Sequence, residues 1–149
     1  MVTTVGTETD IKSLVRDLII LEHDAIAAYE TCIENLSDKS LATQVAAFRK
    51  DHQQHLDVLH EMARELSFDP PSSGDMKQVL TTGKVALAGL MGDATILKAM
   101  KTNEDDTVAA YRRAADHGDA VPKSKAFFAS ALADEERHRA WMDSTAASL

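Results

Sequence analysis

The strongest constraint on the fold is an unbroken seam in the segment 39–66, whose positions step alternately by four and three residues. This spacing keeps all of its members on one face of an α-helix. The seam consists of Leu41, Val45, Phe48, His52, His55, Leu59, Met62 and Leu66. Seven-residue spacing of this kind predicts a long helix that packs against other helices.

Three further segments have similar seams, over about residues 10–36, 93–117 and 123–146. Short breaks join the first two helices and the last two. A crossover at 67–92, rich in Pro, Gly, Ser and Thr, separates the two pairs. An apolar pattern between Met76 and Met91 predicts a shorter helix within this crossover. We therefore expect an all-α protein, a single-domain antiparallel four-helix bundle over residues 1–149.

The composition agrees with this fold and narrows the possible partners. Apolar residues make up 44% of the chain and aromatic residues only 5%, which favours helices over strands. The net charge is −8 and the 16 Lys and Arg are scattered, which argues against nucleic-acid and membrane partners. No apolar run has transmembrane length, so we expect a soluble, cytoplasmic protein. Cys32 is expected to fill space in the core rather than act in redox chemistry.

Ionisable residues interrupt each of the four seams near its middle. A single buried Glu or His is more often a structural residue than a ligand, but clustered buried charges are usually paired or bound to a metal. The six residues concerned are Glu22, His52, His55, Glu104, Glu135 and His138. Because every seam contributes, the sequence predicts that these six side chains form a metal site.

An internal repeat supports this grouping. The segments 22–29 and 104–111 share an acid, an Asp, an Ala-Ala pair and a Tyr at the same offsets. The segments 51–55 and 134–138 align so that His52 corresponds to Glu135 and His55 to His138. Two such hairpins would pack about a pseudo-two-fold axis and bring the six side chains together. Carboxylates and imidazoles without thiolates suit iron or manganese, with zinc possible.

Other polar residues near the seams have less specific patterns. Tyr29 and Tyr111, two turns from the acids, are expected to be core residues rather than redox partners. Asp51 and Asp134 each precede a histidine by four residues, so orienting that histidine and lying on the surface both remain open. The remaining histidines fall off the seams and are expected to be exposed: His23, His60 and His117.

These residues resemble the pattern of the ferritin-like superfamily, which holds bacterioferritin, rubrerythrin and the di-iron carboxylate enzymes. The resemblance spans about residues 10–145. In that family two helices each provide one Glu and two others each provide Glu-x-x-His. The matching residues are Glu22, His55, Glu104, Glu135 and His138. His52 departs from the pattern, because it stands where the family has a bridging Glu.

The resemblance implies a non-haem di-iron or iron/manganese site that reacts with oxygen or peroxide. Glu135 would bridge, Glu22 and Glu104 would be terminal carboxylates, and the three histidines would be nitrogen ligands. Three carboxylates carry −3, one less than the family's four. This charge favours an added hydroxide or oxo bridge, an asymmetric metal pair or a single metal, and these options remain open. An oxidoreductase of ferroxidase or peroxidase type is one possibility, and enzymatic activity is left open.

Two other functions are compatible with the same pattern. A metal-poor helical stress or interaction module would keep the bundle and lose the activity through the change at position 52. A subunit of an iron-storage oligomer would use the same helices in a larger assembly. The oligomeric state is left open, with a homodimer among the options. The sequence has no Cys-x-x-Cys pair, so a redox site here would take its electrons from another protein or a small molecule.

Overall fold

The computed structural model describes residues 3–71, 87 and 89–149. Over this part of the chain there are four α-helices and no strand: α1 (Ile11–Asn35), α2 (Lys39–Glu65), α5 (Asp93–Ala115) and α6 (Pro122–Ser148). The predicted all-α four-helix bundle is confirmed, with helix bounds close to those expected. The shorter helix predicted between Met76 and Met91 lies almost entirely outside the described residues.

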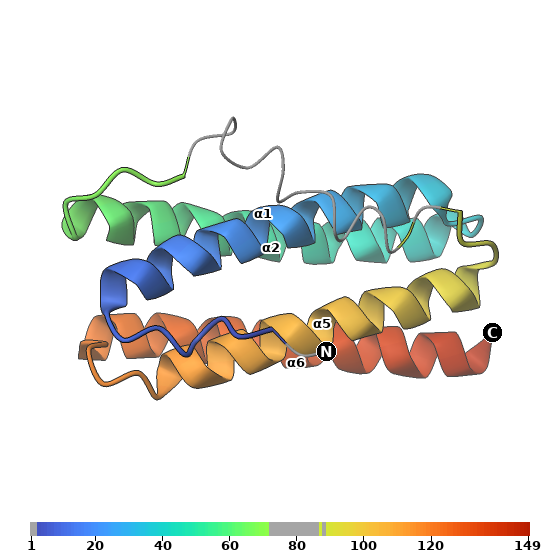
Figure 1. Ribbon diagram of the computed structural model, residues 1–149. Coiled ribbons are helices and arrows are strands. Elements are labelled where there is room, and N and C mark those ends of the chain that lie inside the picture. Colours follow the sequence, from blue (N-terminus) through green and yellow to red (C-terminus); the bar gives the residue numbers. More distant parts are fainter. Residues whose placement is uncertain (1–2, 72–86, 88) are drawn as a thin grey trace.

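The four helices form two antiparallel hairpins, α1 with α2 and α5 with α6 (Figure 1). α1 also packs against α5, whereas α2 and α6 meet at few points. α2 ends at one end of the bundle and α5 begins at the opposite end (Figure 1). As a result α1 runs antiparallel to α5, and α2 antiparallel to α6, in agreement with the antiparallel bundle predicted from the sequence.

Aspartates fix the ends of three helices. Asp10 caps α1 by accepting a hydrogen bond from Ser13 N at 2.9 Å. Asp38 caps α2 in the same way. Asp93, the first residue of α5, accepts hydrogen bonds from the amides of Ser37 at 2.8 Å and Asp38 at 3.0 Å. The turn between α1 and α2 is therefore tied to the start of α5, which fixes the two hairpins relative to each other.

The core contains two apolar clusters, one toward each end of the bundle. Leu14, Leu18 and Phe128 belong to the first cluster, and Cys32 and Phe48 to the second. Cys32 is fully buried, as expected of a core residue, and burial raises the pKa of its thiol to about 12. In the part of the chain that the structure describes, no helix has the length and apolarity needed to cross a membrane.

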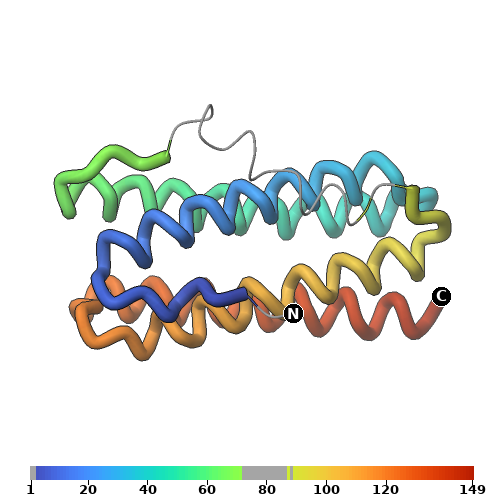
Figure 2. Tube along the Cα trace, viewed as in Figure 1, coloured from blue at the N-terminus to red at the C-terminus, as the bar shows by residue number. Residues whose placement is uncertain are grey.

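The N-terminal segment lies along α5 (Figure 2). The guanidinium of Arg113 donates hydrogen bonds to the carbonyls of Thr3 at 2.6 Å and Val5 at 3.0 Å. Thr3 N donates to Asp106 at 2.8 Å. Directly after these contacts Gly6 has a φ of 103°, a conformation that favours glycine. The segment is therefore held against α5 by hydrogen bonds and by one close backbone approach.

Replacing Gly6 with alanine should destabilise the protein. The added Cβ would lie 2.4 Å from Cβ of Arg113, and the positive φ would be strained as well. We expect a loss of about 1–3 kcal/mol, or roughly 2–4 °C in Tm for each kcal/mol. Thermal unfolding measures this. Gly118→Ala is the matched control, because its Cβ would meet no atom within 4 Å. An equal loss in both variants would contradict the prediction.

Candidate metal centre

The structure brings all six predicted residues together near the middle of the bundle. Each is 4% exposed or less. α1 contributes Glu22, α2 contributes His52 and His55, α5 contributes Glu104, and α6 contributes Glu135 and His138. They meet because each lies on the inward seam of its helix. Their role as metal ligands stays a prediction, which the geometry below supports.

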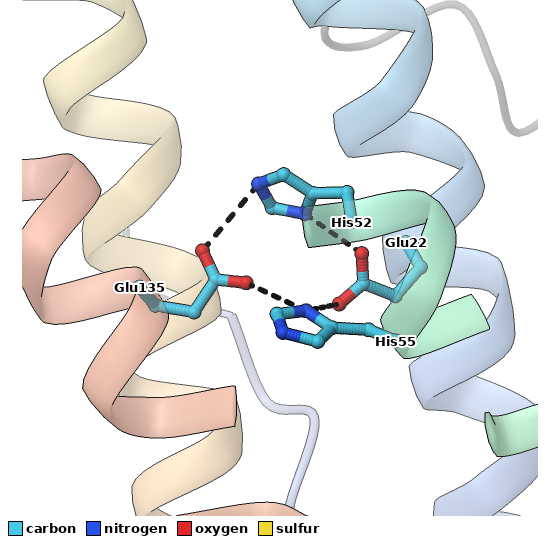
Figure 3. A group of neighbouring side chains, drawn as sticks. All are labelled: Glu22, His52, His55 and Glu135. Atoms are coloured by element: carbon cyan, nitrogen blue, oxygen red, sulfur yellow. Dashed lines mark hydrogen bonds and ion pairs between the residues drawn. The ribbon is translucent and has the colours of Figure 1, made fainter. Parts of the chain in front are cut away.

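Four of these residues form the first ligand group: Glu22, His52, His55 and Glu135. Figure 3 shows their two carboxylates and two imidazoles pointing toward one another in alternation. Glu22 lies 2.7 Å from His52 Nδ1 and 3.2 Å from His55 Nδ1. Glu135 lies 3.5 Å from His52 Nε2 and 3.3 Å from His55 Nδ1. One ligand atom from each residue falls within 4.8 Å of the others, so a single ion can reach all four.

The second ligand group consists of His52, Glu104, Glu135 and His138, whose ligand atoms also lie within 4.8 Å of one another. His52 Nε2 is 3.6 Å from Glu104 Oε1, and His138 Nδ1 is 3.5 Å from Glu135 Oε2. The two ligand groups share His52 and Glu135, the residues that the internal repeat aligns with each other. Each of the two groups could therefore hold one ion, and two residues belong to both groups.

Unpaired polar atoms support a metal in this position. Within the described residues, His52 Nε2, His138 Nδ1 and Glu135 Oε1 are buried without a hydrogen-bond partner. Each has an oppositely charged neighbour only at 3.3–3.6 Å, as an ion pair. Buried polar atoms are rarely left in this state, and a metal ion would satisfy all three. The donor set of imidazole and carboxylate suits iron, manganese or zinc.

Two aspartates orient the outer histidines across the α2–α6 contact. Asp134 lies 2.8 Å from His55 Nε2, and Asp51 lies 2.8 Å from His138 Nε2. The sequence left their role open and placed each beside a histidine of its own helix. The structure pairs each with the histidine of the other helix. Arg137 joins the two aspartates, 2.8 Å from Asp51 and 3.3 Å from Asp134. With Nε2 held by a carboxylate, each outer histidine presents Nδ1 to the core.

Hydroxyl groups hold the core carboxylates from the α1–α5 side. The hydroxyl of Tyr29 donates to Glu104, and that of Tyr111 donates to Glu22 at 2.6 Å. Both tyrosines are buried as expected, but the sequence missed these hydrogen bonds. Thr107 Oγ1 lies 2.9 Å from Glu104 Oε2 and 3.1 Å from Glu135 Oε2, and it was missed as well. The shared Glu-to-Tyr spacing in the repeat was the available signal for the tyrosines.

The prediction that the other histidines are exposed was wrong. His117 is 8% exposed, because the segment before α1 covers it and places the carbonyl of Glu8 2.7 Å from its Nε2. His23 and His60 are half-buried. Their ring centroids lie 6.2 Å apart where α1 packs against α2. None of the three belongs to either ligand group.

Charges balance one another in the metal-free core. Burial alone would raise the pKa of Glu22 and Glu135, but the His52 cation together with hydrogen bonds from the core histidines outweighs burial and lowers both pKa values. Burial and the charge of Glu135 raise the pKa of Glu104 to about 7. Burial disfavours the charged form of His55 and His52 and so lowers their pKa values. The carboxylates of Glu135 and Glu22 favour the charged form and outweigh burial. They raise the pKa of His55 to about 10 and that of His52 well above its usual value.

The metal-free protein should therefore lose stability as the pH rises from about 6.5 to 10. Histidines with a raised pKa stabilise the fold fully below their unfolded pKa of 6.5, and this contribution disappears as they deprotonate. The lowered pKa values of Glu22 and Glu135 act at the acid end, where stability falls below pH 4.5. We expect Tm to drop by about 10 °C between pH 6 and pH 10. Thermal unfolding in chelator measures this, and a flat profile would contradict it.

Comparison with known proteins identifies one family. A family model described as a domain of unknown function, DUF2383, matches residues 10–117. The matched range contains α1, α2 and α5, with four of the six core residues: Glu22, His52, His55 and Glu104. No curated protein and no solved structure matches the chain.

Proposed function

The chain belongs to the DUF2383 family, and from its own residues we propose that it binds two transition-metal ions in the middle of the bundle. The observation that carries this proposal is the pair of buried ligand groups sharing His52 and Glu135. Six buried ionisable side chains cost the fold more than apolar residues of the same size. A site for metal ions explains why they converge there.

Iron, or iron with manganese, is the metal we propose first. The donors are carboxylates and imidazoles, and the only cysteine, Cys32, is not part of either ligand group. The likeness to the ferritin-like pattern, carried by Glu22, Glu104 and Glu135-x-x-His138, supports the same choice. Bound iron would supply redox chemistry with oxygen or peroxide, of ferroxidase or peroxidase type.

The chain's own residues would hold the ligands in place and keep water out. Tyr29 and Tyr111 fix the carboxylates of Glu104 and Glu22 through their hydroxyl groups. The outer aspartates fix His55 and His138 with Nδ1 toward the core. Preorganised ligands of this kind reduce the entropy lost when an ion binds. The burial of all six core residues limits the access of solvent to the site.

Anaerobic titration with ferrous iron, followed by oxygen, tests this function. The full chain should retain up to two iron ions after removal of free metal under argon. Admission of oxygen should then produce near-ultraviolet absorption of protein-bound ferric iron. Protein that retains no iron, manganese or zinc after reconstitution would contradict the proposal.

One observation favours a second function, a metal-poor helical module that acts through interactions. Protonated His52 and His55 already balance the core carboxylates when no metal is bound. Chelation distinguishes the two functions, because an ion that binds only the folded state raises stability by mass action. A Tm that is unchanged by chelator and by added metal would favour the metal-poor module.

A further inference from the structure

His52 differs from the other two core histidines in the surroundings of its second nitrogen. His55 and His138 each direct Nε2 to an outer aspartate at 2.8 Å, which leaves only Nδ1 for the core. His52 is fully buried, and both of its nitrogens face carboxylates of the ligand groups. No outer carboxylate of the described chain holds either of them. It is therefore the one core imidazole with two nitrogens directed at the site.

The two nitrogens of His52 face different ligand groups. Nδ1 lies 2.7 Å from Glu22, which belongs to the first group alone. Nε2 lies 3.6 Å from Glu104, which belongs to the second group alone, and it lacks a hydrogen-bond partner in the described chain. The ring packs against Tyr29, with centroids 4.7 Å apart, which fixes its orientation. Resting on the two-metal function above, we propose that His52 bridges the two ions as an imidazolate.

The charge of the site favours this bridge. The three glutamates contribute −3, whereas two divalent ions carry +4. A neutral His52 would leave one positive charge uncompensated in the core, which is costly away from water. An imidazolate supplies the fourth negative charge. His52 carries a proton on both nitrogens when no metal is bound, so one proton leaves to solvent as each ion binds, and no electron is transferred.

The bridge also gives both ions the same set of donors. The first ligand group contains two glutamates and two histidines, and so does the second. This equality holds only if His52 and Glu135 serve both groups. Position 52 breaks the symmetry of the repeat in sequence, and a bridging imidazolate restores an equal donor set in each half of the site.

An imidazolate bridge sets the distance between the ions. Two metal–nitrogen bonds of about 2.0–2.1 Å plus the width of the ring separate them by about 6 Å. Two-metal sites bridged through oxygen typically hold their ions about 3.5–4 Å apart. The separation is therefore a direct measure of which group lies between the ions, independent of any activity.

Crystals of the full chain loaded with Zn(II) alone test the proposal by anomalous scattering. In the wild type we expect two zinc ions about 6 Å apart, on either side of the His52 ring. His52→Glu, which supplies the charge through a carboxylate, should keep two ions at about 3.5–4 Å. His52→Gln can supply no negative charge and should bind one zinc ion per chain instead of two, as measured by metal analysis in solution.

The outcomes separate this inference from the function on which it rests. Two zinc ions about 3.5–4 Å apart in the wild type would overturn the bridge and leave the two-metal function standing. His52→Gln that binds two ions with wild-type affinity would do the same. A wild-type chain that retains no metal would overturn both. The wild-type separation does not depend on whether either variant folds.

Discussion

Glu135→Ala should remove both metal ions at once. Its carboxylate is the only one that belongs to both ligand groups, 3.3 Å from His55 Nδ1 and 3.5 Å from His138 Nδ1. Without it two glutamates would face two divalent ions, and the excess positive charge would be buried. Metal analysis after gel filtration should fall from about two ions per chain to none.

Further variants test whether the loss of both ions is specific to Glu135. Glu22→Ala and Glu104→Ala each change one ligand group, so each should leave one ion bound. Glu136→Ala is the matched control, because Glu136 is exposed and pairs with Arg112 at 3.1 Å on the surface. It should retain both ions. Glu135→Gln keeps the shape of the side chain and should lose metal in a folded protein. Full metal content in Glu135→Gln would contradict the shared role.

The seam spacing was sufficient to identify the bundle and its polar centre. A residue on a seam that steps by four and three faces the bundle interior whichever helix lies opposite. For this reason Glu22 and Glu104 could be placed in the core without knowledge of their neighbours. The repeat then paired His52 with Glu135, and these are the two residues that the ligand groups share.

The cross-helix partners could not be predicted in the same way. Asp51 and Asp134 lie beside the seam, so their contacts depend on how α2 and α6 are rotated and shifted relative to each other. The sequence spacing suggested partners on the same helix, and the antiparallel contact reversed them. The burial of His117 had a similar cause, because residues before α1 cover it through a contact distant in sequence.

The contacts around the centre are reciprocal, as an internal two-fold axis requires. Tyr29 donates to Glu104 while Tyr111 donates to Glu22. In the same way Asp51 on α2 contacts His138 on α6, and Asp134 on α6 contacts His55 on α2. The symmetric framework therefore extends beyond the ligands to the groups that orient them. Position 52 departs from this symmetry. It corresponds to Glu135 in the repeat, and both residues belong to both ligand groups, but position 52 has an imidazole instead of a carboxylate.

The outer aspartates should control metal affinity although they are not ligands. Asp51→Ala and Asp134→Ala should each weaken binding about 10–100-fold, because a histidine without its Nε2 partner no longer holds Nδ1 toward the ion. Competition with a chelator of known affinity measures the loss. Asp57→Ala on α2 and Asp143→Ala on α6 are matched controls on exposed positions and should bind as the wild type does.

Each aspartate should affect the ion bound by the histidine of the other helix. Variants that bind a single ion can show this. In Glu22→Ala only the second ligand group can hold an ion, and Asp51 orients its histidine, His138. Adding Asp51→Ala to this background should weaken the remaining ion about 10–100-fold, whereas adding Asp134→Ala should leave it nearly unchanged. The Glu104→Ala background should show the reverse, because Asp134 orients His55. If each aspartate instead affected the histidine of its own helix, the packing of α2 against α6 described above would be wrong at the point where it forms the site.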